Sequence, residues 1–281
     1  MRKVTDRSGA AMPVVGQGTW KMGSDPGRRA EEIGALRLGF DLGMTLVDTA
    51  EMYGGGASEE LVGEALAGRR EGLFVVTKVL PQNASRSGTI AAAEASLRRL
   101  RTDRIDLYLL HWTGTHPLAG TLEAFARLRE SGKILSCGVS NFDVADLEEA
   151  ERLPGGSAIA ANQVFYNLRH RGIERTLVPW CAARRVTVMA YTPLDDGKLP
   201  ASRPGGGVIR RVAARHGVSG ATVCLAWTLR HGGAVAVAKA SRPDHVRENA
   251  AAGSLVFSAE DLRELDEAFP APAKAVPLET V

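Results

Sequence analysis

Residues 72–112 read GLFVVTKVLPQNASRSGTIAAAEASLRRLRTDRIDLYLLHW, and this stretch determines the expected fold. A short β-branched run, Val75–Thr77, ends at Lys78, and apolar residues then recur at intervals of three and four, which is the spacing of an amphipathic helix. A second apolar run, Ile105–Leu110, ends at His111. The stretch therefore predicts a strand, a helix and another strand, with a polar residue at the end of each strand.

The same unit recurs on both sides of this stretch. The remaining strands are predicted at Val14–Gly18, Met44–Val47, Lys133–Val139, Ala158–Ala161, Val186–Ala190 and Ala234–Ala238. Successive strand ends are spaced by about 30 residues, and eight such units nearly fill the 281 residues of the chain. Eight alternating strands and helices predict a single (β/α)8 barrel, or TIM barrel, formed by residues 1–281.

An open, doubly wound sheet also alternates strands and helices. Such a sheet carries a Gly-X-Gly-X-X-Gly turn after an early strand to seat a phosphate, and neither Gly54–Gly56 nor Gly205–Gly207 has that spacing. Both glycine runs are therefore interpreted as loops, and further turns are expected at Asp195–Gly197 and Arg203–Gly205. The barrel is the preferred architecture.

Two segments are expected outside the repeating units. Lys3–Thr5 and Ala10–Met12 flank a turn, so they predict an N-terminal hairpin that closes the bottom of the barrel. Leu262, Leu265 and Phe269 follow helical spacing and predict an extra C-terminal helix. The tail after it is short and rich in proline, and we expect no tight lid from it.

Composition and charge exclude several classes of protein. With 44% hydrophobic and 24% charged residues the chain is an ordinary globular protein, and a scattered net charge of +3 predicts no nucleic-acid or membrane partner. The three cysteines form no Cys-X-X-Cys pair, and neither a signal peptide nor an apolar run of about 18 residues is found. These features favour a cytoplasmic protein, and we expect a monomer.

Polar residues at three strand ends are candidates for catalysis. Asp48 and Lys78 should meet at the mouth of the barrel and form an ion pair, because an unpaired charge is costly there. Tyr53, five residues after Asp48, can fold over the same mouth, where an ammonium is expected to lower the pKa of the phenol below its usual 10. With His111, these groups can protonate an alkoxide. None of them is a reductant, so a cofactor has to supply the hydride.

Five motifs resemble the aldo-keto reductase family of NAD(P)H-dependent barrels, and its bacterial, diketogluconate reductase-like members in particular. They are DTAEMYGGGASEELVGEAL from Asp48, FVVTK from Phe74, DLYLLHW from Asp106, GVSNF from Gly138 and NQVFYNL from Asn162. The resemblance extends from about Val14 to Phe269. It implies that Tyr53 is the general acid, that Asp48 and Lys78 tune it, and that His111 orients the carbonyl of an aldehyde or ketone.

The same resemblance implies a set of cofactor contacts. For the nicotinamide, Ser140, Asn141 and Gln163 would bind the carboxamide, whose donor and acceptor they match, and Tyr191 would stack beneath the ring. For the adenosine phosphate, the contacts implied within Val237–Ala252 are Lys239 and Ser241 on the 2'-phosphate, and Glu248 and Asn249 on adenine. His245 stands where many members have an Arg, and Arg242 is expected to replace it. These contacts predict NADPH as the cofactor, preferred over NADH, and no metal.

The substrate pocket is expected to be aromatic. Trp20 and Trp112 follow two strands and should form walls beside the reacting carbon. Such walls suit small aldehydes and ketones of varied shape, so broad specificity is predicted.

Three alternatives remain open from the sequence. A metal-dependent hydrolase would need a His-X-His pair, and the six histidines form none. A Schiff-base lyase would use Lys78 as a nucleophile, which a neighbouring Asp48 would oppose. A nicotinamide-binding sensor or regulatory subunit would keep the cofactor site without efficient catalysis.

Overall fold

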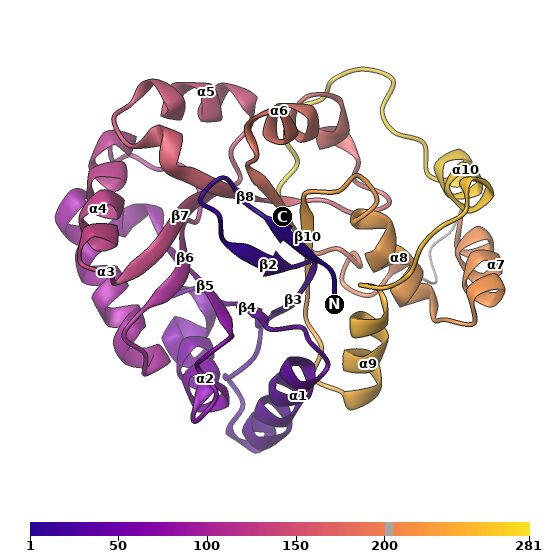
Figure 1. Ribbon diagram of the computed structural model, residues 1–281, viewed down its shortest axis with the longest axis horizontal. Coiled ribbons are helices and arrows are strands. Elements are labelled where there is room, and N and C mark those ends of the chain that lie inside the picture. The colour runs from indigo at the N-terminus through magenta and orange to yellow at the C-terminus, as the bar shows by residue number, and fades with distance from the viewer. Residues whose placement is uncertain (200–204) are drawn as a thin grey trace.

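The computed structural model describes residues 1–199 and 205–281, and its centre is a closed barrel of parallel strands (Figure 1). The strands follow one another around the barrel in chain order, with β10 closing onto β3. They are β3 (Val15–Gly18), β4 (Leu46–Asp48), β5 (Phe74–Val79), β6 (Ile105–Leu110), β7 (Ile134–Ser140), β8 (Ile159–Phe165), β9 (Thr187–Tyr191) and β10 (Ala234–Ala238). All eight predicted strands are present, which confirms the (β/α)8 architecture.

Helices surround the barrel. The ring contains α1 (Arg29–Asp41), α2 (Ala57–Leu66), α3 (Arg86–Leu100), α4 (Leu118–Glu130), α5 (Val144–Arg152), α6 (Leu177–Arg184), α8 (Gly220–Thr228) and α9 (Pro243–Ala251). Two helices, α7 (Gly206–His216) and α10 (Ala259–Ala268), lie outside this ring and against each other (Figure 1). Helix α10 is the extra C-terminal helix that the sequence predicts.

The third helix shows how local sequence sets these elements. Ser85 caps α3 by accepting a hydrogen bond from the backbone N–H of Gly88 at 3.1 Å. Its predicted apolar face, which includes Leu97 and Leu100, is buried against the barrel. The helix ends at Arg101, which adopts a left-handed conformation with φ of 51°.

Alternate strand residues fill the barrel or pack under the helices. The interior is formed by Met12, Leu46, Val76, Leu107, Leu109, Ala161, Met189, Val235 and Val237. Their neighbours, such as Val47 and Val75, belong to the layer between strands and helices. This period of two decides which side chains reach the centre of the barrel.

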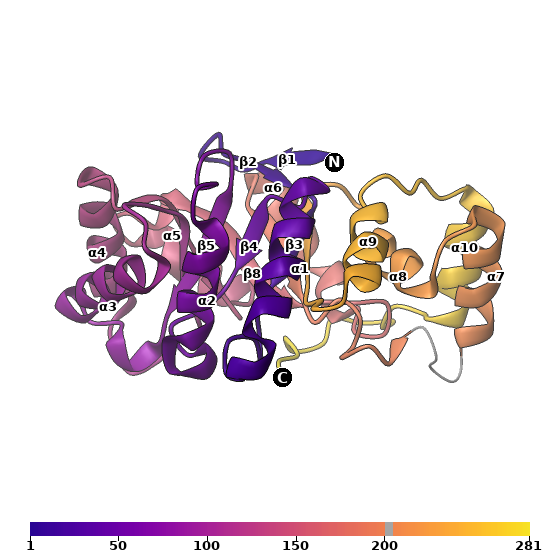
Figure 2. The ribbon, with the colours of Figure 1, turned by 90° about the horizontal axis from the view of Figure 1, so that it is seen from below.

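A hairpin covers one end of the barrel. Strands β1 (Lys3–Thr5) and β2 (Ala11–Pro13) pair in antiparallel fashion, and the side chain of Met12 is fully buried below them. Oδ1 of Asp6 accepts hydrogen bonds from the backbone N–H groups of Ser8 and Ala10, at 2.8 and 3.0 Å, and so holds the turn. Figure 2 shows the hairpin at the end of the barrel opposite the C-terminus.

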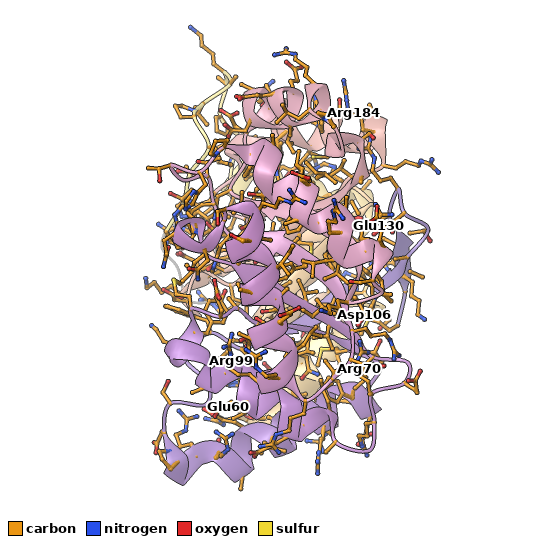
Figure 3. The ribbon with its side chains drawn as sticks, turned by 90° about the vertical axis from the view of Figure 1, so that its left-hand side faces the viewer. Glu60, Arg70, Arg99, Asp106, Glu130 and Arg184 are labelled. Carbon is orange, nitrogen blue, oxygen red and sulfur yellow. The ribbon has the colours of Figure 1, made fainter. Side chains whose placement is uncertain are left out.

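The outer surface carries charges of both signs. Figure 3 shows acidic and basic side chains interspersed over the helices on one side of the molecule. One pair there, largely buried, joins Arg70 to Asp106, with 2.6 Å between Nη2 and Oδ2. Within the described ranges, no helix has the length and apolar character needed to cross a membrane.

One loop prediction is wrong. Gly206 and Gly207 are the first residues of α7, and Gly205 caps this helix with φ of 106°. A Cβ at Gly205 would lie 2.2 Å from the ring of Phe269, so the close approach of α7 to the C-terminal segment requires glycine. The predicted turn at Arg203–Gly205 lies largely outside the described residues.

Candidate active site

The polar side chains predicted at the strand ends face one mouth of the barrel. Each stands two residues after an apolar residue of the barrel interior, and residues two apart on a strand point to the same face. The pairs are Leu46 and Asp48, Val76 and Lys78, Leu109 and His111, Ala161 and Gln163, Met189 and Tyr191, and Val237 and Lys239. The period of two thus brings residues far apart in sequence to the carboxyl end of the barrel.

Asp48 and Lys78 form a buried ion pair, as the sequence predicts. Nζ of Lys78 donates to both carboxylate oxygens of Asp48, at 2.9 and 2.8 Å, and to the backbone oxygen of Thr49 at 2.8 Å. Burial is the largest single influence on the pKa of Lys78 and would lower it, but Asp48 and Tyr53 together outweigh burial and raise it. Lys78 is therefore a fixed ammonium rather than a free amine.

Gln163 adds a contact that the sequence did not predict. Its Nε2 donates to Oδ1 of Asp48 at 2.7 Å, and both side chains are buried. The proposed carboxamide-binding residue is thereby linked to the ion pair.

Tyr53 lies over the ammonium of Lys78. Its phenol oxygen is 3.5 Å from Nζ, and Nζ is 5.1 Å from the centre of the ring. Its ring meets Trp20 edge to face at 4.9 Å between centres, and His111 at 5.9 Å. These contacts fix the phenol at the centre of the mouth.

The expected direction of the Tyr53 pKa shift is wrong for this structure. Burial raises the pKa of the phenol above its ordinary 10, and the attraction of Lys78 offsets only part of that rise. The phenol is consequently protonated at neutral pH, which is the state that a proton donor needs.

Three glycines shape the turn that carries Tyr53. The turn η2 (Tyr53–Gly56) places Gly54, Gly55 and Gly56 at φ of 60°, 63° and 100°, values that favour glycine. A Cβ on Gly56 would lie 2.6 Å from Cδ of Arg99. The backbone of the turn therefore rests directly on the Arg99 side chain.

Two carboxylates tie this turn to strand β5 and its loop. Glu59, fully buried, accepts from the Thr77 hydroxyl and from Nε of Arg99, each at 2.6 Å. Glu51 accepts from the backbone N–H of Leu80 at 2.7 Å. These links hold Tyr53 in register with Lys78, which adjoins Thr77.

His111 is a neutral imidazole. Burial, assisted by the charge of Lys78, lowers its pKa to about 3. Its Nδ1 is buried and has no hydrogen-bond partner within the described part of the chain. His111 therefore has unused hydrogen-bonding capacity beside Tyr53.

The three residues implied to bind a carboxamide lie together. Ser140 donates to the backbone oxygen of Gln163 at 2.8 Å, and Asn141 donates from Nδ2 to the backbone oxygen of His111 at 3.1 Å. The hydroxyl of Tyr191 donates to Oδ1 of Asn141 at 2.9 Å. Asn141 adopts φ of 59°, a conformation that asparagine tolerates better than most residues.

The C-terminal tail reaches this end of the barrel at two points, His170 and Tyr191. His170 contacts Glu279 at 3.2 Å between Nδ1 and Oε2, and the backbone of Val281 lies near enough to the phenol of Tyr191 to oppose the rise of its pKa. Burial raises the pKa of that phenol to about 12. The end of the chain therefore lies against the ring implied to stack beneath the nicotinamide.

The residues after β10 lie at the same mouth but do not all converge. Lys239 lies 3.4 Å, from Nζ to Oγ, from Ser241, whereas Arg242 pairs with Asp244 at 2.6 Å on the surface. In α9, Asn249 is buried, while His245 and Glu248 are not. The arrangement brings Lys239 and Ser241 together and leaves Arg242 committed elsewhere.

Trp20 and Trp112 are the aromatic side chains that the sequence assigned to the pocket. They are 47% and 36% exposed, and each contacts a candidate catalytic ring: Trp20 meets Tyr53, and Trp112 meets His111 at 4.7 Å. Both flank the mouth and leave it open to solvent.

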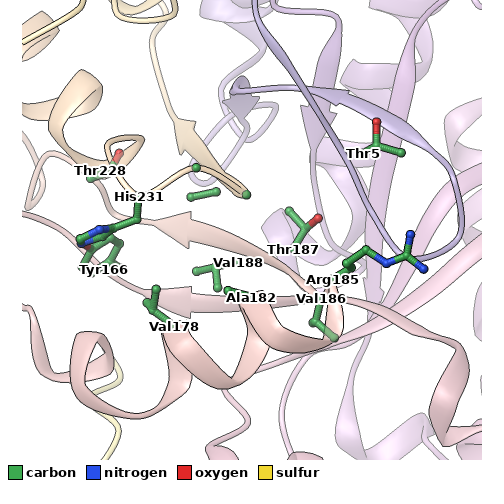
Figure 4. Close-up of a pocket in the computed structure, with 13 residues that line it drawn as sticks. Thr5, Tyr166, Val178, Ala182, Arg185, Val186, Thr187, Val188, Thr228 and His231 are labelled. Carbon is green, nitrogen blue, oxygen red and sulfur yellow. The ribbon is translucent and has the colours of Figure 1, made fainter.

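A cavity of about 380 Å³ lies elsewhere, between helices α6 and α8 and the outer side of β9 and β10 (Figure 4). Its lining includes Val178, Val188 and His231 and none of the candidate catalytic residues. We therefore place the active site at the mouth rather than in this cavity, because the buried Asp48–Lys78 pair, the Tyr53 phenol and the His111 imidazole converge at the mouth.

Comparison with known proteins agrees with the geometry. A model of the aldo/keto reductase family matches residues 14–269. The chain belongs to the aldo/keto reductase family. This confirms the resemblance that the motifs indicate.

Individual members of the family are similar to this chain over almost its whole length. Methylglyoxal reductase YeaE of Escherichia coli is 48% identical over 272 residues, 96% of each protein. Glyoxal reductase of Bacillus subtilis is 34% identical over 266 residues, 92% of this chain and 90% of that protein. An aldo-keto reductase from Klebsiella pneumoniae, crystallised in complex with NADPH, superposes with a TM-score of 0.94 at 44% identity, covering 100% of this chain and 99% of that one.

Two alternatives can be judged against this site. The raised pKa of Lys78 opposes a Schiff-base lyase, since an amine nucleophile must lose its proton. In the described part of this aldo/keto reductase, no group of three or more His, Cys, Asp or Glu side chains is placed to hold a metal ion.

Sequence reasoning missed several contacts of this aldo/keto reductase. Glu51 and Glu59 brace the Tyr53 turn, and Arg28 donates from Nη2 to Oγ of Ser241 at 2.9 Å, each across segments that are distant in sequence. Glu51 and Glu59 lie in the motif that begins at Asp48 and contains Tyr53, so their closeness to Tyr53 in sequence could have indicated a role beside it. Arg28 lies in none of the five motifs, so no sequence pattern indicated its contact with Ser241.

Proposed function

We propose that this protein reduces small aldehydes and ketones to alcohols with NADPH, and that Tyr53 donates the proton. Carbonyl reduction is supported by membership of the aldo/keto reductase family and by relatives named methylglyoxal and glyoxal reductases. The complex of the similar Klebsiella pneumoniae reductase supports NADPH as the cofactor.

The mouth offers groups that fit this dinucleotide. Ser140, Asn141 and Gln163 present hydroxyl and amide groups suited to a carboxamide, and Tyr191 presents an aromatic ring. Lys239 supplies a cation for a phosphate. When bound, NADPH would supply the hydride that none of the side chains can provide.

In the proposed mechanism, Tyr53 moves the proton. As the carbonyl carbon gains a hydride, its oxygen gains negative charge and takes the proton of the Tyr53 hydroxyl, which leaves an alcohol and a phenolate. Lys78, 3.5 Å away, stabilises that phenolate without giving up its own proton. Asp48 keeps Lys78 charged and in place.

His111 is proposed to position the carbonyl group. A neutral imidazole carries one N–H donor, and the His111 ring contacts the ring of Tyr53. A hydrogen bond from His111 would hold the carbonyl oxygen within reach of the phenol. Because the ring is neutral, it orients the oxygen without competing with Tyr53 as the acid.

Small dicarbonyls such as methylglyoxal are the first substrates to test, since the 48% identical relative is named for that compound. The half-exposed walls of Trp20 and Trp112 contact candidate catalytic rings. An open, apolar pocket supports broad specificity, which we also propose.

The observation that carries this proposal is the Lys78 ammonium held between a buried carboxylate and a phenol. The test is oxidation of NADPH by methylglyoxal in the wild type and in Tyr53→Phe. Loss of one oxygen should lower kcat by about 10²- to 10⁴-fold and leave the Kd for NADPH unchanged. An unchanged kcat would contradict the assignment of Tyr53.

A further inference from the structure

Two cationic side chains from opposite ends of the sequence converge on one hydroxyl group. Lys239 follows β10, and its Nζ lies 3.4 Å from Oγ of Ser241. Arg28, which is 213 residues before Ser241, donates from Nη2 to the same oxygen at 2.9 Å. Both positive charges are thus held at a single neutral oxygen, and Ser241 itself is only 7% exposed.

The protein does not neutralise these charges fully. Glu31 is 3.8 Å from Arg28, and both side chains are about half exposed, at 48% and 45%, so this pair is weak. In the described part of the chain, Lys239 has no carboxylate at ion-pair distance, and its ammonium hydrogen-bonds to the Ser241 hydroxyl. Two like charges held this close favour an anion between them.

The Arg28 side chain starts from a fixed backbone. Pro26 begins the turn η1 (Pro26–Arg28), and Oδ1 of Asp25 accepts from the backbone N–H of Gly27 at 2.9 Å. The backbone N–H of Arg28 itself bonds to the oxygen of Asp25 at 3.1 Å. A capped turn with proline loses little further freedom when a ligand binds.

We propose that Arg28 is the second cation of the ribose 2'-phosphate site, and that with Lys239 and Ser241 it determines the preference for NADPH over NADH. The inference rests on the proposed function, since it concerns the same cofactor. A guanidinium has five N–H donors, so Arg28 can bind a phosphate while it keeps its bond to Ser241. With both cations donating to it, the Ser241 oxygen leaves its own proton free for a phosphate oxygen.

Arg242, which the sequence favoured for this role, is already paired. Its Nε and Nη2 donate to the two carboxylate oxygens of Asp244, at 3.1 and 2.6 Å, so the edge of the guanidinium that would bind a phosphate is occupied. The Asp244 carboxylate would also repel a phosphate. Among the described residues, no carboxylate accepts two hydrogen bonds from Arg28.

The proposal predicts discrimination between ligands that differ by one phosphate. NADH offers no anion to the two cations, whereas the 2'-phosphate of NADPH carries a charge between about −1.5 and −2. A hydrogen bond to a charged group typically changes affinity by about tenfold or more. Arg28→Met should therefore weaken NADPH binding at least about tenfold and change NADH binding by less than about twofold.

The experiment is calorimetric titration of the full-length protein with NADPH, NADH, adenosine 2',5'-bisphosphate and adenosine 5'-diphosphate. Wild type, Arg28→Met and the matched control Arg242→Met are compared, with the melting temperature of each as the test of folding. Arg28→Met should lose affinity only for the two ligands that carry a 2'-phosphate, and Arg242→Met should resemble wild type. Should Arg28→Met be unstable, Arg28→Gln provides the same comparison.

The two proposals fail in different ways. Wild-type protein that binds neither dinucleotide would overturn the proposed function. Wild-type protein that prefers NADPH, together with an Arg28→Met variant that keeps the whole preference or an Arg242→Met variant that loses it, would overturn the inference about Arg28 alone.

Discussion

Asp48 and Lys78 form an ion pair in which both carboxylate oxygens accept from one ammonium, at 2.9 and 2.8 Å, with 3% of Asp48 and none of Lys78 exposed. Removing one partner of such a pair leaves a buried charge without compensation. The pair is therefore important both for stability and for the proton donor above it.

Asp48→Asn should lower the free energy of unfolding by about 3–5 kcal/mol and reduce kcat. Without the carboxylate, burial favours loss of the Lys78 proton, and the phenolate of Tyr53 loses its stabilising charge. Urea denaturation and turnover of methylglyoxal measure the two effects.

The control for this change is Asp41→Asn, which breaks the exposed pair with Arg69. That substitution should cost at most about 1 kcal/mol and leave kcat alone. If both substitutions lowered the free energy of unfolding by the same amount, the buried pair would not have the importance for stability that we assign to it.

The pH dependence of reduction should be flat through neutral pH. The Tyr53 phenol, whose pKa lies above its usual 10, is protonated below that pKa, so activity should be lost only as the pH rises through it. His111, with a pKa of about 3, stays neutral throughout this range. A profile of kcat against pH with a midpoint near 7 would count against both assignments.

Gly56→Ala should displace the turn that carries Tyr53. The new Cβ would lie 2.6 Å from Arg99, at φ of 100°, and a shift of about 1 Å in a catalytic group can cost about 10²-fold in rate. Gly55→Ala is the matched control, since Gly55 also has positive φ but nothing within 4 Å of a Cβ. The kcat of Gly56→Ala should fall much further than that of Gly55→Ala, and similar values would show that backbone strain alone matters.

Met12→Ala should separate stability from chemistry. Met12 is fully buried below the hairpin, at the end of the barrel away from the mouth, and its truncation should cost about 2–5 kcal/mol. Thermal unfolding should show this loss while kcat at 25 °C stays close to the wild-type value. A large fall in kcat in the folded variant would mean that the interior transmits strain along the strands.

The sequence predicts the barrel and most of the mouth because both follow from one rule. Apolar runs give the strands, and the period of two carries Asp48, Lys78 and His111 inward after Leu46, Val76 and Leu109. This argument needs only local spacing, so it could be made without coordinates.

What the sequence could not predict depends on distance and burial. Arg28 reaches Ser241 across 213 residues, and the tail places Val281 at Tyr191; neither contact follows from a local pattern. The sign of the Tyr53 pKa shift was wrong because it depends on how far burial outweighs Lys78, and spacing carries no information on burial depth. The roles of the cofactor contacts, the monomeric state and the cytoplasmic location stay predictions.

The four tryptophans divide into two optical populations. Trp20 and Trp112 stand 47% and 36% exposed at the mouth, whereas Trp180 and Trp227 are 9% and 0% exposed among the helices. Fluorescence from Trp20 and Trp112 should lie at longer wavelength and be quenched by acrylamide. Fluorescence from Trp180 and Trp227 should lie at shorter wavelength and resist quenching. Occupancy of the mouth can therefore be followed by intrinsic fluorescence, with the buried pair as an internal reference and no added label.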